Sequence, residues 1–185
     1  MIQESGYPNI HQELIDRCRV NDREAQFEIY RLYYKAMYNT SLRIVQDPAE
    51  AEDVMQESFL SAFQKIGTYS GSVSFGAWLK KIVINQSLDS VKKKRVPFES
   101  LEGDSIRDRE VEAGDFIAEI RIEEIRDAII KLPDGYRIVL TLYLIEGYDH
   151  EEIGQILNIS SSTSRSQYTR GRQKLIELLK ERKHE

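Results

Sequence analysis

Cysteine is almost absent from this sequence: Cys18 is the only one among 185 residues. A chain with one thiol cannot form an internal disulfide, which fits a reducing cytoplasm. Leu14, Val20 and Phe27 lie near Cys18 along the chain, and this apolar neighbourhood predicts that the thiol is buried.

Long hydrophobic runs are missing as well. No apolar stretch approaches the ~20 residues that a helix needs to cross a bilayer. The N-terminal residues include Glu4, His11, Glu13 and Asp16 and lack the pattern of a signal peptide. We therefore expect no membrane insertion and a soluble, cytoplasmic protein.

Residue types that build enzyme active sites are scarce. The three histidines, His11, His150 and His184, are scattered, and no phosphate-binding glycine loop is present. The sequence therefore predicts no catalytic residue, no metal site and no cofactor, and it disfavours an enzyme. His150 is interpreted as part of the start of its helix rather than as a metal ligand.

Prolines are few, and strong helix formers dominate. The four prolines, at positions 8, 48, 97 and 133, fall where they can punctuate helices rather than break them. We therefore expect an all-α fold. An acidic, glycine-containing stretch in the middle favours two helical domains over one. The expected domains span residues 10–95 and 116–183, joined by an acidic linker at residues 96–115.

Apolar residues at helical spacing predict the elements of both domains. In the first domain we expect two helices within residues 12–44 that meet near Asn21, then helices at residues 48–66 and from Phe75 to Pro97. Asp47 followed by Pro48 is typical of a helix start. In the second domain, Phe116, Ile117 and Ile120 open a helical stretch that ends at a turn of residues 133–135. Helices follow at residues 136–145, 149–157 and 161–180.

The net charge of -5 hides two basic clusters. One comprises Lys80, Lys81 and residues 92–95, the other Arg165, Arg170, Arg172 and Lys174. Acidic residues between them place much of the negative charge in the linker. Because Lys and Arg neutralise phosphates, this distribution predicts selective rather than adhesive DNA binding.

The last two predicted helices have the pattern of a helix-turn-helix. Asn158, Ile159 and Ser160 form the short turn, and Ser161 or Ser162 can cap the second helix. The residues expected to contact DNA are Thr163, Arg165, Ser166, Thr169, Arg170 and Arg172. The sequence leaves open whether an arginine binds a base edge or a phosphate. A merely solvated basic face is the alternative.

A Ser/Gly loop at residues 67–74 lies beside aromatic and basic residues. This composition is typical of a pocket for an unstacked base. The candidates are Tyr69, Ser70, Gly71, Ser72, Trp78, Lys80, Lys81 and Asn85. Phe75 and Trp78 are more often core residues, and Tyr69 is the better candidate for exposure.

The helix that follows Asp47 carries an acidic face. Its polar residues are Asp47, Glu50, Asp53, Gln56 and Glu57. Val54, Phe59 and Phe63 lie on the opposite side. Charge on a helix is usually only a solvated face, so spacing alone assigns no partner here.

These three features occur in the order found in the extracytoplasmic-function (ECF) subfamily of bacterial RNA polymerase sigma factors, which the chain resembles from about Leu14 to Leu179. The most specific stretches are residues 47–63, which read DPAEAEDVMQESFLSAF, residues 75–95, which read FGAWLKKIVINQSLDSVKKKR, and residues 132–175, which begin LPDGYRIVLTLYLIEGYDHEEIGQIL. The resemblance implies an initiation subunit with a region 2 type domain and a region 4 type domain. It does not imply catalysis.

The resemblance also implies partners and roles. The acidic face would dock on core RNA polymerase, whose largest-subunit clamp and flap regions are the expected partners. The Tyr69 loop and Asn85 would capture a flipped base of the minus-ten promoter element, and the helix-turn-helix would read the minus-thirty-five element. The acidic linker would thread toward the RNA exit path. An anti-sigma factor is a further expected partner.

The chain departs from the family pattern at Ser164, Gln167 and Gly171, and we expect these departures to weaken contacts with the upstream element. Two alternatives stay open. One is a free-standing DNA-binding regulator whose N-terminal domain is a sensor, and the other is an adaptor that mainly titrates regulators.

Overall fold

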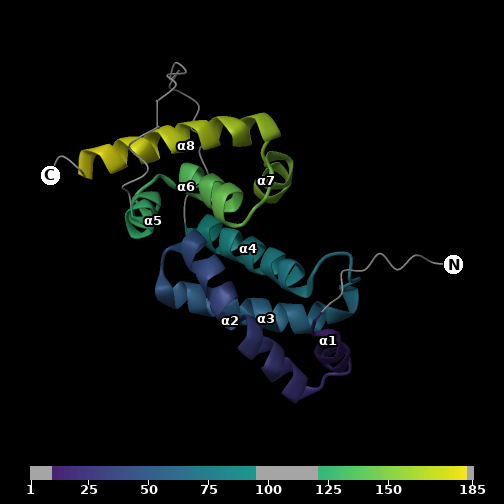
Figure 1. The fold of residues 1–185 in the computed structure, drawn as a ribbon. Helices are drawn as coiled ribbons and strands as arrows, with labels where there is room; N and C mark the ends of the chain where they lie inside the picture. The colour runs from purple at the N-terminus through teal and green to yellow at the C-terminus, as the bar shows by residue number, and fades with distance from the viewer. Residues whose placement is uncertain (1–9, 95–120, 183–185) are drawn as a thin grey trace. The chain divides into compact units, whose positions relative to one another are not determined.

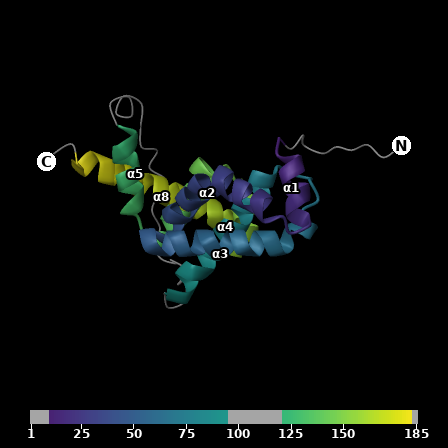
Figure 2. The same ribbon diagram turned by 90° about the horizontal axis from the view of Figure 1, so that it is seen from below.

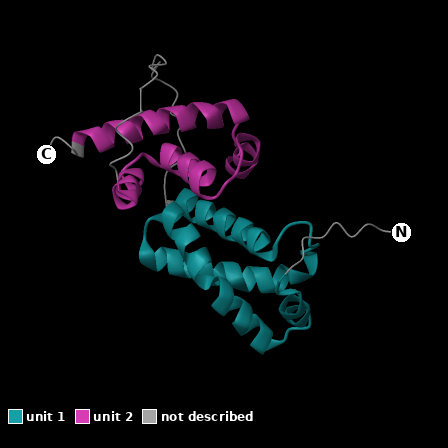
Figure 3. Cartoon of the chain, in the orientation of Figure 1, with its two compact units in different colours: residues 1–98 teal, residues 99–185 magenta. Residues whose placement is uncertain are grey.

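The structure is a computed structural model that describes residues 10–94 and 121–182. The chain divides into two compact units, residues 1–98 (unit one) and residues 99–185 (unit two) (Figure 3). Every regular element of the described residues is helical, so the prediction of an all-α fold with two helical domains is confirmed. The predicted acidic linker, residues 96–115, and the positions Phe116, Ile117 and Ile120 lie outside the described residues. The exact domain bounds therefore stay a prediction.

Unit one is built on three long helices. These are α2 (Arg23–Val45), α3 (Pro48–Lys65) and α4 (Phe75–Lys94), and each packs against the other two (Figures 1 and 2). The shorter α1 (Gln12–Arg19) packs on α2, and a 3-10 turn, η1 (Ile66–Thr68), follows α3. The predicted helices of this unit are confirmed to within a few residues.

Local sequence explains where these helices begin and end. Asp47 accepts a hydrogen bond from the Glu50 amide at 2.8 Å, and Pro48 occupies the first helical turn of α3. Gln46 ends α2 in the left-handed conformation with φ of 62°. Asn21, with φ of 60°, makes the break between α1 and α2 at the predicted position.

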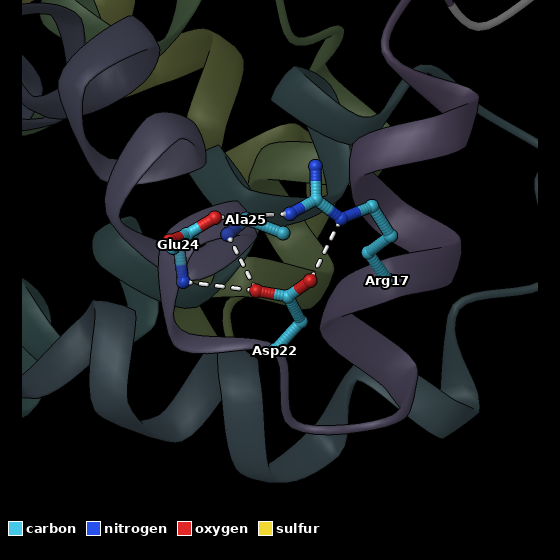
Figure 4. A network of polar contacts seen from close by, with 4 residues as sticks. All are labelled: Arg17, Asp22, Glu24 and Ala25. Atoms are coloured by element: carbon cyan, nitrogen blue, oxygen red, sulfur yellow. Dashed lines mark hydrogen bonds and ion pairs between the residues drawn. The ribbon is translucent and has the colours of Figure 1, made fainter.

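A polar network joins α1 to α2 (Figure 4). Asp22 caps α2 by accepting from the amides of Glu24 at 2.9 Å and Ala25 at 3.2 Å. Its other carboxylate oxygen accepts from Arg17 Nε at 2.7 Å. The hydrogen bond from Arg17 holds the pKa of the Asp22 carboxyl below its usual range and raises the pKa of Arg17. The network therefore holds α1 at a defined angle to α2.

The core of unit one lies where its helices meet. Ile29, Met37, Phe59, Phe75 and Leu79 are among its buried members. Cys18 is fully buried, as predicted, and this burial raises the pKa of its thiol to about 11. Val20 and Phe27, which the sequence places near Cys18, are instead exposed. Both side chains point away from the core of unit one.

Unit two contains four α-helices among its described residues. They are α5 (Ile122–Ile130), α6 (Asp134–Leu140), α7 (His150–Leu157) and α8 (Ser161–Arg182) (Figure 1). The helix predicted at residues 136–145 begins two residues earlier, and a π-helical segment, η3 (Thr141–Ile145), replaces its second half. Leu132, Leu140, Leu175 and Leu179 form the core between α5, α6 and α8.

Gly171 marks a close approach between α8 and α6. A Cβ atom at this position would lie 3.0 Å from Tyr136 Cβ and 3.2 Å from Leu140 Cδ1. A side chain at this position would therefore require Tyr136 and Leu140 to shift by a few tenths of an ångström. The departure of this glycine from the family pattern therefore has a packing reason.

Among residues 10–94 and 121–182, no helix is both long and apolar enough to span a bilayer.

Candidate polymerase and nucleic-acid interfaces

Tyr69 is buried, with only 4% of its surface exposed. The prediction that Tyr69 is exposed is therefore wrong. Its ring packs against Phe75 and Trp78, with centroid separations of 5.5 and 5.4 Å, and its phenol donates to the carbonyl oxygen of Val73 at 2.7 Å. Tyr69 thus anchors the loop of residues 69–74, because its own side chain closes that loop from beneath.

The residues after Tyr69 form the outer edge of the loop. Ser70, Ser72, Val73 and Ser74 are exposed. Gly71 adopts φ of +78°, a conformation that side chains disfavour. The Ser70 hydroxyl donates to Ser72 Oγ at 3.1 Å. The edge is therefore an exposed turn in which the hydroxyls of Ser70 and Ser72 bond each other.

An exposed stripe on α4 continues from this loop. Ser74 caps α4 by accepting from the Ala77 amide at 3.3 Å, and Lys81 and Asn85 lie exposed two and three turns beyond Ser74 on the same side of the helix. Trp78 is half-buried against the unit one core, and Lys80 is half-buried as well. The structure therefore brings the loop, Lys81 and Asn85 together on one surface.

The predicted acidic residues of α3 differ in their contacts. Asp47, Asp53, Gln56 and Glu57 are exposed and Glu50 is half-buried; Asp47 also caps the helix, and Glu50 accepts a hydrogen bond from Ser90 of α4. Two exposed residues that the prediction missed belong to the same helix, Glu52 and Leu60. Helical spacing could have found Leu60, because it follows Asp53 by seven residues and Glu57 by three. We call this surface the α3 docking face, comprising Glu52, Asp53, Gln56, Glu57 and Leu60.

Polar side chains join α3 to α4 behind these surfaces. The Ser58 hydroxyl donates to Gln86 Oε1 at 2.7 Å, and Gln86 Nε2 donates to Ser61 Oγ at 2.9 Å. Directed bonds of this kind hold two helices in one register, which apolar contacts alone specify less sharply. The docking face and the Lys81–Asn85 stripe are therefore parts of one rigid pair of helices.

The predicted helix-turn-helix is present in unit two. Helices α7 and α8 are joined by residues 158–160, with Asn158 in the left-handed conformation at φ of 57°. Ser160, not Ser161 or Ser162, caps α8, because its hydroxyl accepts from the Thr163 amide at 3.0 Å. The prediction placed the cap one or two residues too late.

His150 couples the two helices of this motif. Its Nδ1 lies 2.9 Å from the Ser164 hydroxyl, and its ring stacks on Tyr143 with centroids 4.6 Å apart. Burial, followed by the positive charge of Arg165, lowers the pKa of His150, while Asp149 opposes this shift. As predicted, His150 belongs to the start of α7. The described residues hold no group of three or more metal-binding side chains.

The outer face of α8 carries the predicted DNA contacts. Of these, Thr163, Arg165, Ser166, Thr169 and Arg172 are exposed, and Arg170 is half-buried. The guanidinium of Arg165 donates to Ser161 Oγ at 3.1 Å. Ser164 and Gln167, in contrast, are buried. Their departure from the family pattern therefore alters packing behind the recognition helix rather than its exposed surface.

Comparison with known families matches both units. The model of "Sigma-70 region 2" matches residues 29–96, and the model of "Sigma-70, region 4" matches residues 122–175. The first match spans most of α2 together with α3 and α4. The second spans α5 to α7 and the first two-thirds of α8.

Characterised relatives match over nearly the whole chain. The ECF RNA polymerase sigma factor SigW of Bacillus subtilis is 30% identical over 178 residues, which cover 90% of this chain and 95% of the relative. SigM of the same organism is 33% identical over 150 residues, covering 80% and 91%.

Solved structures give a likeness of fold. The sigma factor RpoE in complex with the anti-sigma factor NepR from Bartonella quintana aligns with a TM-score of 0.56 at 20% identity, covering 83% of this chain and 95% of that one. CnrH in complex with the cytosolic domain of CnrY aligns with a TM-score of 0.57 at 20% identity, covering 92% and 97%.

Proposed function

We propose, from the premise that this chain belongs to the ECF sigma factors of RNA polymerase, that the surfaces described above divide the work of promoter recognition. Unit one binds core polymerase through the α3 docking face and holds unpaired minus-ten bases on the loop of residues 69–74 and on α4. Unit two reads the minus-thirty-five element through α8. The observation that carries this proposal is the joint exposure of the loop serines, Lys81 and Asn85, the last two on the same side of α4 as Ser74.

The chemistry of this surface suits an unpaired base. Loop hydroxyls and main-chain groups can bond base edges, the Asn85 amide can both donate and accept, and Lys81 can neutralise a backbone phosphate. A flipped base costs a few kcal/mol of stacking and pairing. Because Tyr69 lies beneath the loop and offers no open ring face, hydrogen bonds to the loop and α4 must supply most of the recognition.

The α3 docking face suits a protein partner. Asp53 and Glu57 supply charge, and Leu60 is exposed to 63% of its surface. An apolar side chain surrounded by charged ones is the arrangement of an interface centre with a polar rim. We assign this face to core polymerase rather than to DNA because its negative charge disfavours DNA.

The exposed face of α8 suits double-stranded DNA. Thr163 and Ser166 lie in its first turns, which enter the major groove in this motif, and Arg165, Thr169 and Arg172 extend the surface. A bidentate arginine on guanine contributes ~1–3 kcal/mol of discrimination, whereas a phosphate contact contributes affinity without sequence choice.

The remaining assignments follow from the role of an initiation subunit. We propose that the chain is not catalytic, that the polymerase supplies the catalytic metal, and that the chain works in the cytoplasm beside the polymerase. The two solved neighbours are described with protein partners, an anti-sigma factor in one case and the cytosolic domain of CnrY in the other. We propose that an anti-sigma factor also holds this chain.

In vitro run-off transcription tests the proposal. Core polymerase from the organism that encodes the chain is mixed with the purified protein and fragments of that organism's genome. We expect discrete transcripts whose upstream regions share two elements. A free-standing regulator or a titrating adaptor would give discrete transcripts only when another sigma factor is added, and that result would refute the proposal.

A further inference from the structure

Arg19, the last residue of α1, connects that helix to the loop of residues 69–74. Its Nη2 donates to the carbonyl oxygen of Tyr69 at 2.9 Å, across 50 positions of sequence. Its Nη1 donates to Asp16 at 2.9 Å, and Asp16 also accepts from Gln12 at 2.9 Å. One terminal nitrogen of the guanidinium is thus bonded within α1, and the other is bonded to the loop.

The helix that carries Arg19 is itself held firmly. Ile15 and Cys18 of α1 are fully buried in the unit one core. The pairing of Arg17 with Asp22 joins the end of α1 to the cap of α2, so the segment around Arg19 has a defined direction (Figure 4). The side chain therefore reaches the loop from a rigid support.

The hydrogen bond from Arg19 holds the first residue of the loop, Tyr69. Tyr69 is held by its carbonyl through Arg19, by its phenol through the Val73 carbonyl, and by its ring against Phe75. These contacts fix the chain on both sides of residues 70–72. The exposed edge between them carries the groups that face a base.

We propose that Arg19 is a positioning residue for base recognition. By holding the Tyr69 carbonyl, it keeps the edge at residues 70–72 in the geometry that accepts the base, so the loop does not have to be ordered during binding. The inference rests on the proposed function, because it assigns Arg19 to the minus-ten surface without placing it in contact with DNA. Loss of the bond should relax base choice more than it weakens the fold.

The test compares variants of the full chain bound to core polymerase. Arg19→Met keeps an unbranched aliphatic side chain and removes the hydrogen bonds to Asp16 and to the Tyr69 carbonyl. Arg19→Lys keeps the positive charge but lacks the two guanidinium nitrogens that make these two bonds at once. Arg31→Met is the matched control, because Arg31 is an exposed arginine that pairs with Glu28 three positions earlier on its helix, as Arg19 does with Asp16. The probes are fluorescent single-stranded oligonucleotides that carry the non-template minus-ten sequence mapped by run-off transcription, or the same sequence with one base replaced.

The readout is the ratio of the dissociation constants for the two oligonucleotides, which a change in the folded fraction does not alter. We expect Arg19→Met to reduce this ratio ~5-fold, since the lost bond has a charged donor and lies only partly buried. Arg19→Lys should fall between Arg19→Met and the wild type, and Arg31→Met should match the wild type. All four proteins should bind core polymerase equally.

Three outcomes would overturn the inference. One is a ratio in both Arg19 variants equal to that of Arg31→Met. Another is loss of core binding in both Arg19 variants, because a residue that only supports the fold behaves in that way. If the wild-type holoenzyme itself fails to distinguish the oligonucleotides, the proposed function fails, and the role of Arg19 fails with it.

Discussion

The phenol of Tyr69 donates to the carbonyl oxygen of Val73 across 2.7 Å, so the side chain at the start of the loop closes the loop at its far end. The ring beneath this bond is buried. The residue that composition suggests as a stacking platform therefore lies beneath the loop of residues 69–74 and supports it.

Two substitutions separate these roles of Tyr69. Tyr69→Phe keeps the ring and removes the closing bond, and we expect it to lower the free energy of unfolding by ~1 kcal/mol. Tyr69→Ala also removes the ring from the core and should cost ~3–5 kcal/mol. Chemical denaturation measures both. Equal costs for the two variants would contradict the ring's place in the core.

The boundaries of most helices could be predicted because short-range chemistry determines them. Asp47 and Pro48 start α3, and Asp149 caps α7 by accepting from the amides of Glu151 and Glu152 at 2.8 Å. In both cases the deciding atoms lie within a few residues of one another. The burial of Cys18 is predicted as well, although it depends on the core of unit one rather than on Val20 and Phe27, which are exposed.

What could not be predicted depends on tertiary contacts. The burial of Tyr69 depends on Phe75 and Trp78, and Gly171 is explained by its close approach to Tyr136 and Leu140, which are distant in sequence. A π-helical segment at residues 141–145 leaves the same apolar pattern as an α-helix. The link from Arg19 to the Tyr69 carbonyl has no sequence signal at all, because the acceptor is main chain.

Gly154 allows the turn of the helix-turn-helix to close. A Cβ atom there would lie 2.8 Å from the carbonyl oxygen of Ile159, a main-chain atom that cannot move without changing the turn. Alanine would gain ~1 kcal/mol in helix propensity, but the clash should outweigh it, so Gly154→Ala should destabilise the chain by ~1–3 kcal/mol. Thermal unfolding measures this. Gln155→Ala, at an exposed neighbouring position, is the control, and a higher melting temperature for Gly154→Ala would contradict the account.

His150 makes the stability of unit two depend on pH. Burial lowers its pKa in the folded state below the usual 6.5, so the unfolded chain takes up the proton first as pH falls. The stabilisation is complete above that usual value and declines as pH drops below it toward the folded pKa. We expect a lower melting temperature at pH 5.5 than at pH 7.5.

The substitution His150→Gln provides the control for this pH dependence. Glutamine keeps a hydrogen-bonding group near Ser164 but does not titrate, so the difference in melting temperature between the two pH values should shrink. An unchanged difference would assign the pH dependence to other groups.

The α3 docking face predicts how core binding responds to substitution. Leu60→Ala and Asp53→Ala should each weaken binding to core polymerase by ~10-fold, since a central apolar contact and a charged contact are both lost. Leu32→Ala, which truncates an exposed leucine on α2, should leave the affinity unchanged. Fluorescence titration of core polymerase measures all three. Wild-type affinity for both α3 variants would place the docking surface elsewhere.

We propose above all that this chain makes the polymerase open promoter DNA through the loop of residues 69–74 and α4. Permanganate footprinting tests this most directly, because it reacts with unpaired thymines. On a promoter mapped by run-off transcription, the wild-type holoenzyme should produce reactive thymines around the minus-ten element, and Asn85→Ala should reduce them while core binding persists. A normal bubble with a double variant, Lys81→Ala and Asn85→Ala, would contradict the claim.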